Sequence, residues 1–238
     1  MITRTTFVLF ILTLFVLPLA AQLTVSPLFT DHMVVQRERP LRIWGTGSPG
    51  KTVELRVLEQ RYTSKVDPDG HWKIVASPLP TGGPYRLALQ SGRDQLTIAD
   101  VLVGDVWICS GQSNMEWVVS GSNDAEREMA AAHDTRIRHF KVPNSFSETP
   151  SDELAGGMWE VTSPETVGNF TAVGYFFARE LRQEMDVPIG LINTSWGGSR
   201  IEAWMSAEAQ QLADPAAAIA EYRSDILARI EARMQALR

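Results

Sequence analysis

Two stretches of the sequence combine residue types that can do chemistry. Residues 109–117 read CSGQSNMEW and directly follow a continuous apolar run. A serine placed two residues after a glycine at the end of a buried strand can sit on a tight turn that exposes its hydroxyl at the edge of the sheet. Ser113 is therefore a candidate nucleophile, although position 115 is Met and the stretch is not the G-x-S-x-G elbow. The alternative is that Ser113 only caps the turn that follows it.

The second stretch is residues 192–204, INTSWGGSRIEAW, where an apolar run ends in the pair Gly197-Gly198. Glycine lets backbone N–H groups approach a ligand closely, which an oxyanion site requires. An ordinary turn between a strand and a helix is the alternative interpretation. If both stretches lie at the same edge of one sheet, we expect the Ser113 hydroxyl oxygen within about 8 Å of the nearer glycine nitrogen.

Alternating strands and helices are predicted to position these two stretches. Residues 101–109 form an apolar run typical of a strand buried on both faces, and residues 137–142 and 187–193 are two further candidate strands. Helices are predicted over 124–132, with Asn123 as the cap, and over 172–184. This alternation indicates an α/β domain with a parallel sheet over residues 101–238.

Residues 22–100 have a different pattern. Short runs that alternate or are rich in β-branched and aromatic residues are separated by turn sequences such as Ser48-Pro49-Gly50. The pattern predicts an antiparallel, jelly-roll-like β-sandwich, separate from the α/β domain and joined to it near residue 100. The fold class is therefore α/β with a leading β-sandwich domain.

Composition and charge exclude several classes of function. The 238 residues carry 22 Lys and Arg against 28 Asp and Glu, a net charge of −6, which disfavours a nucleic-acid partner. The single cysteine, Cys109, excludes an intramolecular disulfide and a zinc site built from several thiols, and we expect it to be an inert core residue. We expect no metal and no cofactor.

The first 21 residues are typical of a secretory signal peptide. They contain Arg4, an apolar stretch over residues 7–19, and small residues at Ala20 and Ala21. The apolar stretch is too short for a membrane span and is interrupted by Thr13 and Pro18. We expect cleavage after Ala21, no membrane association afterwards, and a secreted or periplasmic protein.

The sequence resembles the sialate O-acetylesterases, a branch of the SGNH-type serine hydrolases. Four segments carry the resemblance: residues 29–37 (FTDHMVVQR), 103–117 (VGDVWICSGQSNMEW), 170–179 (FTAVGYFFAR) and 188–198 (PIGLINTSWGG). The resemblance implies hydrolysis of O-acetyl esters on sugars, above all 9-O-acetyl sialic acid. It also implies Ser113 as the nucleophile, with the backbone of Ser113, Gly197 and Gly198 as oxyanion donors. Contacts with the sugar are implied for Gln112, Asn114, Trp117, Trp196 and Glu202, while Trp204 is a further flat surface. Taken singly, each tryptophan is more often a core residue, because large aromatic side chains are highly buried on average.

The sequence departs from that family's pattern in its later part. The family supplies a histidine and an aspartate from a block near the end of the catalytic domain, whereas the four histidines here are His32, His71, His133 and His139. A Tyr-Gln-Gly-Glu-Ser-Asn-like block that helps to form the oxyanion site is also missing. We therefore expect the chain to be the front part of a longer enzyme and to be weakly active alone. A non-catalytic carbohydrate-binding or structural module and an acetylxylan-type esterase are the alternatives; the oligomeric state is left open.

Overall fold

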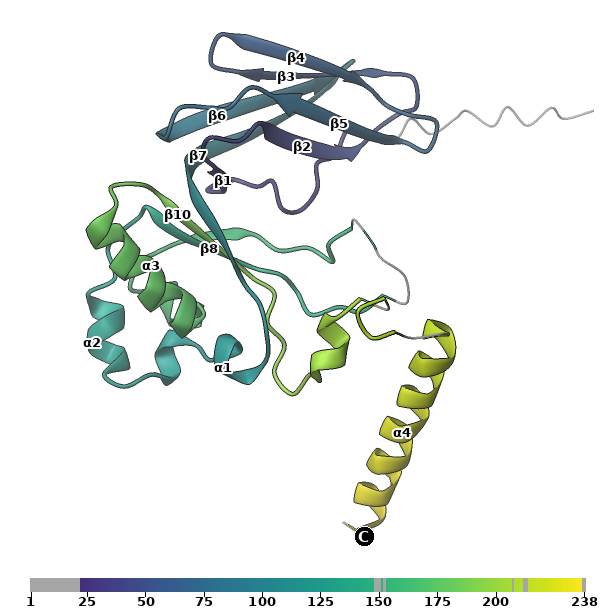
Figure 1. Cartoon of the computed structure of the whole chain (residues 1–238). Coiled ribbons are helices and arrows are strands. Elements are labelled where there is room, and N and C mark those ends of the chain that lie inside the picture. Colours follow the sequence, from purple (N-terminus) through teal and green to yellow (C-terminus); the bar gives the residue numbers. More distant parts are fainter. Residues whose placement is uncertain (1–21, 148–150, 152, 207, 212–213, 237–238) are drawn as a thin grey trace, which may run out of the picture.

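The chain folds into a β-rich body and an α/β body that share one long strand. The computed structural model describes residues 22–147, 151, 153–206, 208–211 and 214–236, and the predicted signal peptide lies outside these residues. Strand β7 (Asp94–Cys109) runs from the upper body into the lower one (Figure 1). The result is a mixed α/β fold with one large sheet that includes parallel strands.

The β-rich body is built from the first six strands and the first half of β7. The strands are β1 (Val34–Gln36), β2 (Leu41–Thr46), β3 (Thr52–Val57), β4 (Gln60–Lys65), β5 (His71–Ala76) and β6 (Gly82–Ser91). Strands β4, β3, β6 and β7 lie in that order in the large sheet, β1 pairs with β7, and β2 and β5 form a separate antiparallel pair. Within this body, the buried apolar side chains of both sheets belong to one cluster. The jelly-roll-like sandwich remains a prediction, because the second sheet has only two strands.

Strand β7 corrects the expected start of the α/β part. The strand begins at Asp94 instead of residue 101, so residue 100 lies within a strand and not in a linker. Its first half pairs antiparallel with β6 up to Val103, and its second half pairs parallel with β10 from Asp105 onward. A methyl group added at Gly104, between the two halves, would lie 1.9 Å from the Pro188 carbonyl oxygen. Glycine is thus required where β7 changes partners, and a hydrophobic pattern does not reveal such a change of partner.

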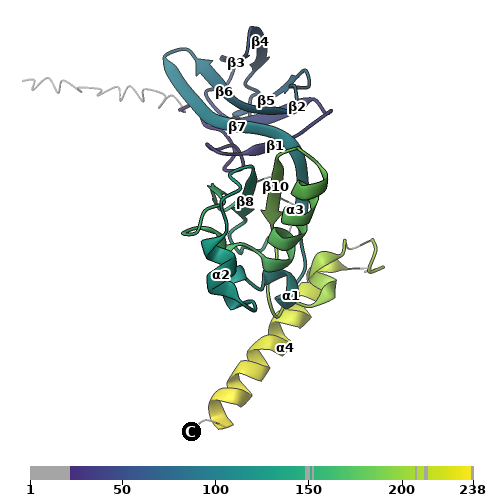
Figure 2. The ribbon, with the colours of Figure 1, turned by 90° about the vertical axis from the view of Figure 1, so that its left-hand side faces the viewer.

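The α/β body has a small sheet with helices on one face. Strand β7 continues through β10 (Ile189–Asn193) and β8 (Ile137–Lys141), all parallel, to the antiparallel edge strand β9 (Trp159–Val161). Helices α2 (Ala125–Ala130) and α3 (Ala172–Glu184) lie on the same side of this sheet (Figures 1 and 2). Short 3-10 helices, η1 (Val119–Gly121), η2 (Val167–Asn169) and η3 (Ile201–Trp204), complete the connections.

The helix ends follow local signals in part. Helix α3 has the predicted bounds, and the Thr171 side chain caps it by accepting a hydrogen bond from the Gly174 N–H. The predicted Asn123 cap of α2 is wrong: Asp124 is the cap residue, in a left-handed conformation and without a side-chain hydrogen bond. The turn before α2 decides which residue is the cap, and residue propensities alone do not predict that turn.

The last helix, α4 (Pro215–Ala236), projects away from both bodies (Figures 1 and 2). It starts at the proline that the sequence places after Asp214, and the Asp214 carboxylate accepts a hydrogen bond from the Ala217 N–H at 3.0 Å. No helix within the described ranges combines the length and the apolar composition needed to cross a membrane.

A buried arginine ties the two bodies together. The Arg138 side chain, on β8, is 4% exposed and forms an ion pair with Asp100 at 2.9 Å. Its guanidinium also donates to the backbone carbonyl oxygens of Asp100 and His32, and the His32 ring contacts the Asp100 carboxylate at 2.7 Å. These contacts join the lower sheet to the point where β7 enters the upper body.

We expect Arg138→Met to lower the free energy of unfolding by about 2–3 kcal/mol, at the low end for a broken buried pair because the remaining Asp100 carboxylate is partly solvated. Urea denaturation at pH 7 measures this change. Arg136→Met is the matched control, because Arg136 directly precedes β8 and pairs with an aspartate that is 86% exposed. Such exposed pairs contribute about 0–1 kcal/mol. Equal losses in the two variants would contradict the assigned role of Arg138.

Candidate active site

Ser113 lies at the carboxyl end of β7, where the sequence places it. It is the first residue of helix α1 (Ser113–Glu116), and its side chain is exposed. Gly111, in the turn before it, has φ +130°, a conformation that favours glycine. Within the described residues the Ser113 hydroxyl makes no hydrogen bond, and its backbone N–H, as the first of a helix, has no intrahelical acceptor. The serine is open to a ligand.

The segment after β10 runs beside the turn that carries Ser113. Thr194 N–H donates to the Cys109 carbonyl and Trp196 N–H to the Gly111 carbonyl, each at 2.9 Å. A methyl group added at Gly197 would lie 3.7 Å from the Ser113 hydroxyl oxygen. Because the nitrogen of a residue lies roughly 2.5 Å from its Cβ position, the Gly197 nitrogen is within roughly 6 Å of that oxygen. The expected proximity of the two stretches is confirmed.

The Gly197 N–H, however, is not free. It donates to a carboxylate oxygen of Glu116, in helix α1, at 2.7 Å. In this arrangement of the loop a side chain already accepts from the Gly197 N–H, and the expected donation from Gly197 or Gly198 to an oxyanion stays a prediction. Gly198 has φ +76° and a backbone N–H that makes no hydrogen bond within the described part of the chain. Of the two glycines, Gly198 is the one with an available donor.

Lys141 is a site residue that the sequence analysis missed. Its ammonium donates to the Ser195 carbonyl at 2.8 Å and lies 3.9 Å from the second carboxylate oxygen of Glu116. Burial lowers the pKa of Lys141, and the Glu116 charge opposes that shift. Lys141 is the last residue of β8 and lies one residue before the end of the strand predicted over residues 137–142. Neighbouring parallel strands end at one edge of a sheet. A charged residue at the end of this predicted strand was therefore the feature of the sequence that could have identified Lys141 as a site residue.

The buried side-chain amide of Asn193 is hydrogen-bonded to the segment that leads into the Gly197-Gly198 loop. Its side-chain oxygen accepts hydrogen bonds from the Ser195 N–H at 3.0 Å and from the Ser195 hydroxyl at 2.5 Å. Both residues are buried. Asn193 and Ser195 therefore belong to the support of the Gly197-Gly198 loop and not to its ligand-facing surface.

None of the four histidines contacts Ser113. His32 pairs with Asp100, His71 begins strand β5 in the upper body, and His133 is exposed beyond helix α2. His139 is fully buried on β8, stacks on Phe170 with ring centroids 4.5 Å apart, and neither ring nitrogen has a hydrogen-bond partner in the described part. Among the residues that the structure describes, the serine thus has no hydrogen-bonded base.

The expected sugar-contacting residues all lie at the surface. Trp117, Trp196 and Trp204 are 59%, 39% and 37% exposed, so the core position that each could have taken is wrong. Two of their ring N–H groups are used within the loops, Trp117 to the Gly121 carbonyl and Trp204 to the Ser199 hydroxyl. The remaining three, Gln112, Asn114 and Glu202, are also exposed. Cys109, by contrast, is buried, and burial raises the pKa of its thiol to about 11, which confirms the expected inert residue.

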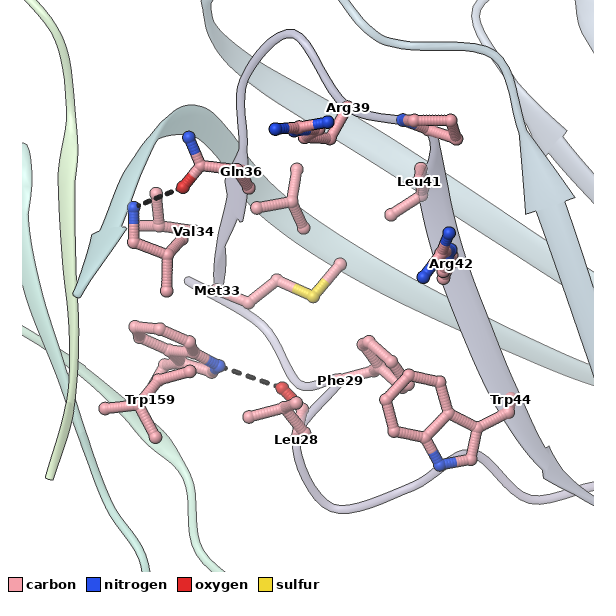
Figure 3. Close-up of a pocket in the computed structure, with 14 residues that line it drawn as sticks. Leu28, Phe29, Met33, Val34, Gln36, Arg39, Leu41, Arg42, Trp44 and Trp159 are labelled. Carbon is pink, nitrogen blue, oxygen red and sulfur yellow. Dashed lines mark hydrogen bonds between the residues drawn. The ribbon is translucent and has the colours of Figure 1, made fainter. Parts of the chain in front are cut away.

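An apolar cavity lies elsewhere in the molecule. It has a volume of about 480 Å³ and is lined mainly by apolar side chains from both bodies, including Met33, Trp44, Val106 and Trp159 (Figure 3). Val106 and Ile192, which both line the cavity, lie within strands, whereas Ser113 follows the end of one. This cavity is separate from the serine and its loop.

Comparison with known proteins identifies the family of the chain. The profile of a family described as "Carbohydrate esterase, sialic acid-specific acetylesterase" matches residues 103–236, a range that contains Ser113, Lys141 and Gly197. The chain belongs to this esterase family. It is 37% identical over 196 residues to the sialate O-acetylesterase of Mus musculus and 35% identical to that of Homo sapiens, with 74% of this chain covered in each case.

The chain is also similar to a solved structure. The crystal structure of a carbohydrate acetylesterase from Xanthomonas citri superposes with a TM-score of 0.76 at 46% identity, over 78% of this chain and 43% of that one. The matched part is 36% of the mouse esterase and 37% of the human one, so the chain spans just over a third of the curated relatives.

Proposed function

We propose that this chain carries the nucleophile of an enzyme that hydrolyses O-acetyl esters on sugars, with 9-O-acetyl sialic acid as the substrate. The observation that supports the proposal most is the exposed Ser113 hydroxyl within roughly 6 Å of the Gly197 backbone, in a chain of the esterase family. A serine and a glycine loop at one sheet edge are the two parts that acyl transfer needs first.

In the proposed reaction, the Ser113 oxygen attacks the carbonyl carbon of the acetyl group. The negative charge that forms on the carbonyl oxygen is stabilised by the N–H groups of Ser113 and Gly198, and each well-aimed donor contributes about 3–4 kcal/mol. Collapse of the tetrahedral intermediate releases the sugar hydroxyl and leaves Ser113 acetylated. Water then releases acetate and restores the serine.

The base that takes the Ser113 proton is proposed to come from polypeptide beyond these 238 residues. A serine hydroxyl needs such a base at hydrogen-bond distance, and all four histidines are engaged or placed elsewhere. On this proposal, the α/β body is the front part of a longer esterase domain, joined to the β-rich body through strand β7.

The sugar is proposed to lie over the exposed tryptophans beside the serine. Trp117 follows helix α1, and Trp196 directly precedes Gly197. Flat apolar rings suit the apolar face of a sugar, while Gln112, Asn114 and Glu202 supply polar contacts. Residues 1–21 are proposed to export the protein, so the sugar ester is met outside the cytoplasm.

The proposal is tested by labelling with an alkyl fluorophosphonate, which reacts with nucleophilic serines. Because Ser113 has no base among the described residues, we expect little labelling in plain buffer. With imidazole added as a substitute base, we expect one adduct per chain by intact mass, located at Ser113 by peptide mapping. Ser113→Ala should abolish the adduct. Ser110→Ala is the matched control, since Ser110 is an exposed serine three residues away and should label normally.

The outcome also separates the alternatives. Sugar binding without any label on Ser113, with or without imidazole, would contradict the esterase and favour a carbohydrate-binding module. Acetate release from acetylated xylan but not from O-acetylated sialic acid would keep the esterase and change its substrate.

A further inference from the structure

The Glu116 side chain connects the nucleophile helix to the glycine loop. It starts from the last residue of helix α1, whose first residue is Ser113, and accepts the Gly197 N–H at 2.7 Å. Its other oxygen lies 3.9 Å from the Lys141 ammonium, which in turn donates to the Ser195 carbonyl of the same loop. Three segments that are distant in the sequence thus meet at one carboxylate.

We propose that Glu116 is a positioning residue of the esterase reaction, which holds the Gly197-Gly198 loop at a fixed distance from the Ser113 hydroxyl through the Gly197 N–H. This inference rests on the proposed function, since the distance matters only if Ser113 is acylated. Glu116 does not exchange protons with the substrate; its task is to orient the neighbouring Gly198 N–H toward the forming oxyanion.

The close approach of Glu116 to Gly197 supports this role. A methyl group at position 197 would lie 2.3 Å from the accepting oxygen of Glu116, whereas the Ser113 hydroxyl would lie at an ordinary 3.7 Å. The loop therefore approaches Glu116 so closely that the carboxylate occupies the space of a side chain. Gly197 has no positive φ that would demand glycine for backbone reasons.

The Lys141 ammonium offsets the negative charge of Glu116 near Ser113. A negative charge near Ser113 would oppose the charge of an oxyanion, and the Lys141 ammonium partly neutralises it. The hydrogen bond and the charge of Glu116 therefore have separable effects. A glutamine at position 116 keeps an oxygen that accepts from the Gly197 N–H and removes the charge.

The test compares Glu116→Ala with Glu116→Gln by saturation kinetics of fluorophosphonate labelling in imidazole buffer. We expect Glu116→Ala to lower the maximal labelling rate about 10- to 100-fold, as for a displaced catalytic group, with little change in half-saturating concentration. Glu116→Gln should stay within about threefold of the unaltered chain, since a neutral acceptor replaces a charged one. Glu126→Ala, at an exposed glutamate on α2, is the control.

Two further measurements decide whether the contact with Gly197 is responsible. Amide hydrogen exchange of Gly197, followed by NMR, should speed up at least about tenfold in Glu116→Ala and not in Glu116→Gln. Gly197→Ala should slow labelling strongly in the unaltered background but add little in Glu116→Ala, because the added methyl group then has no carboxylate to displace.

The outcomes distinguish the positioning role of Glu116 from the esterase function on which it rests. If Ser113 is not labelled in the unaltered chain even with imidazole, the esterase proposal is overturned, and with it the catalytic role of the contact between Glu116 and Gly197. If Ser113 is labelled, but Glu116→Ala labels normally or Glu116→Gln fails as badly as Glu116→Ala, only the positioning role of Glu116 is overturned.

Discussion

Ser113→Ala is expected to lower the esterase activity of a protein that also contains the base by about 10⁴- to 10⁶-fold, and to leave the 238-residue chain almost unchanged. The reason is the state of the serine: its hydroxyl has no hydrogen-bonded base among the described residues. A serine that is not activated contributes little, so removing it costs little. Acetate release from 9-O-acetyl sialic acid, measured for both lengths of chain with and without the substitution, checks this.

One result of the same assay would contradict this prediction. Full turnover by the 238-residue chain that disappears in His71→Ala would make His71 the base and overturn the interpretation as a partial enzyme. The position of His71 in the β2–β5 pair of the upper body, far from helix α1, argues against that result (Figure 1).

His139 is expected to make the fold sensitive to acid. The ring is fully buried and unpartnered in the described part, and burial, together with the Lys141 charge, lowers the pKa of His139 to about 3. In the unfolded chain that pKa is about 6.5. Between these values the unfolded state binds the proton and the folded state does not, so stability is complete above pH 6.5 and falls as the pH drops toward 3. At pH 4 the loss from this group is on the order of 3 kcal/mol.

Urea denaturation of the unaltered chain and of His139→Phe at pH 7.5 and pH 4.0 measures this effect. Phenylalanine keeps the stacking on Phe170 and removes both unpaired nitrogens, so the variant should lose about 3 kcal/mol less between the two pH values. His133→Phe, at an exposed histidine, should follow the unaltered chain. Parallel losses in all three proteins would show that His139 is not the cause.

Local patterns in the sequence were sufficient for several elements. The 3.6-residue period placed helix α3 at its observed bounds, and apolar runs located β8 and β10 to within two residues. The order of strands and helices also predicted that Ser113 and Gly197 follow two strands of one parallel sheet, and β7 and β10 are indeed neighbours. These features depend on spacing within a few residues, which a single sequence carries.

Only the tertiary structure decided how the two bodies join and which N–H groups are free. Strand β7 crosses residue 100 because its two halves pair with different strands, and pairing partners far apart in the sequence leave no local pattern. For the same reason the sequence predicted the glycine loop but not its carboxylate: Glu116 and Gly197 are separated by 81 positions. Short-range periodicity therefore determined the elements and the position of the nucleophile, whereas long-range contacts determined the hydrogen bonds around it.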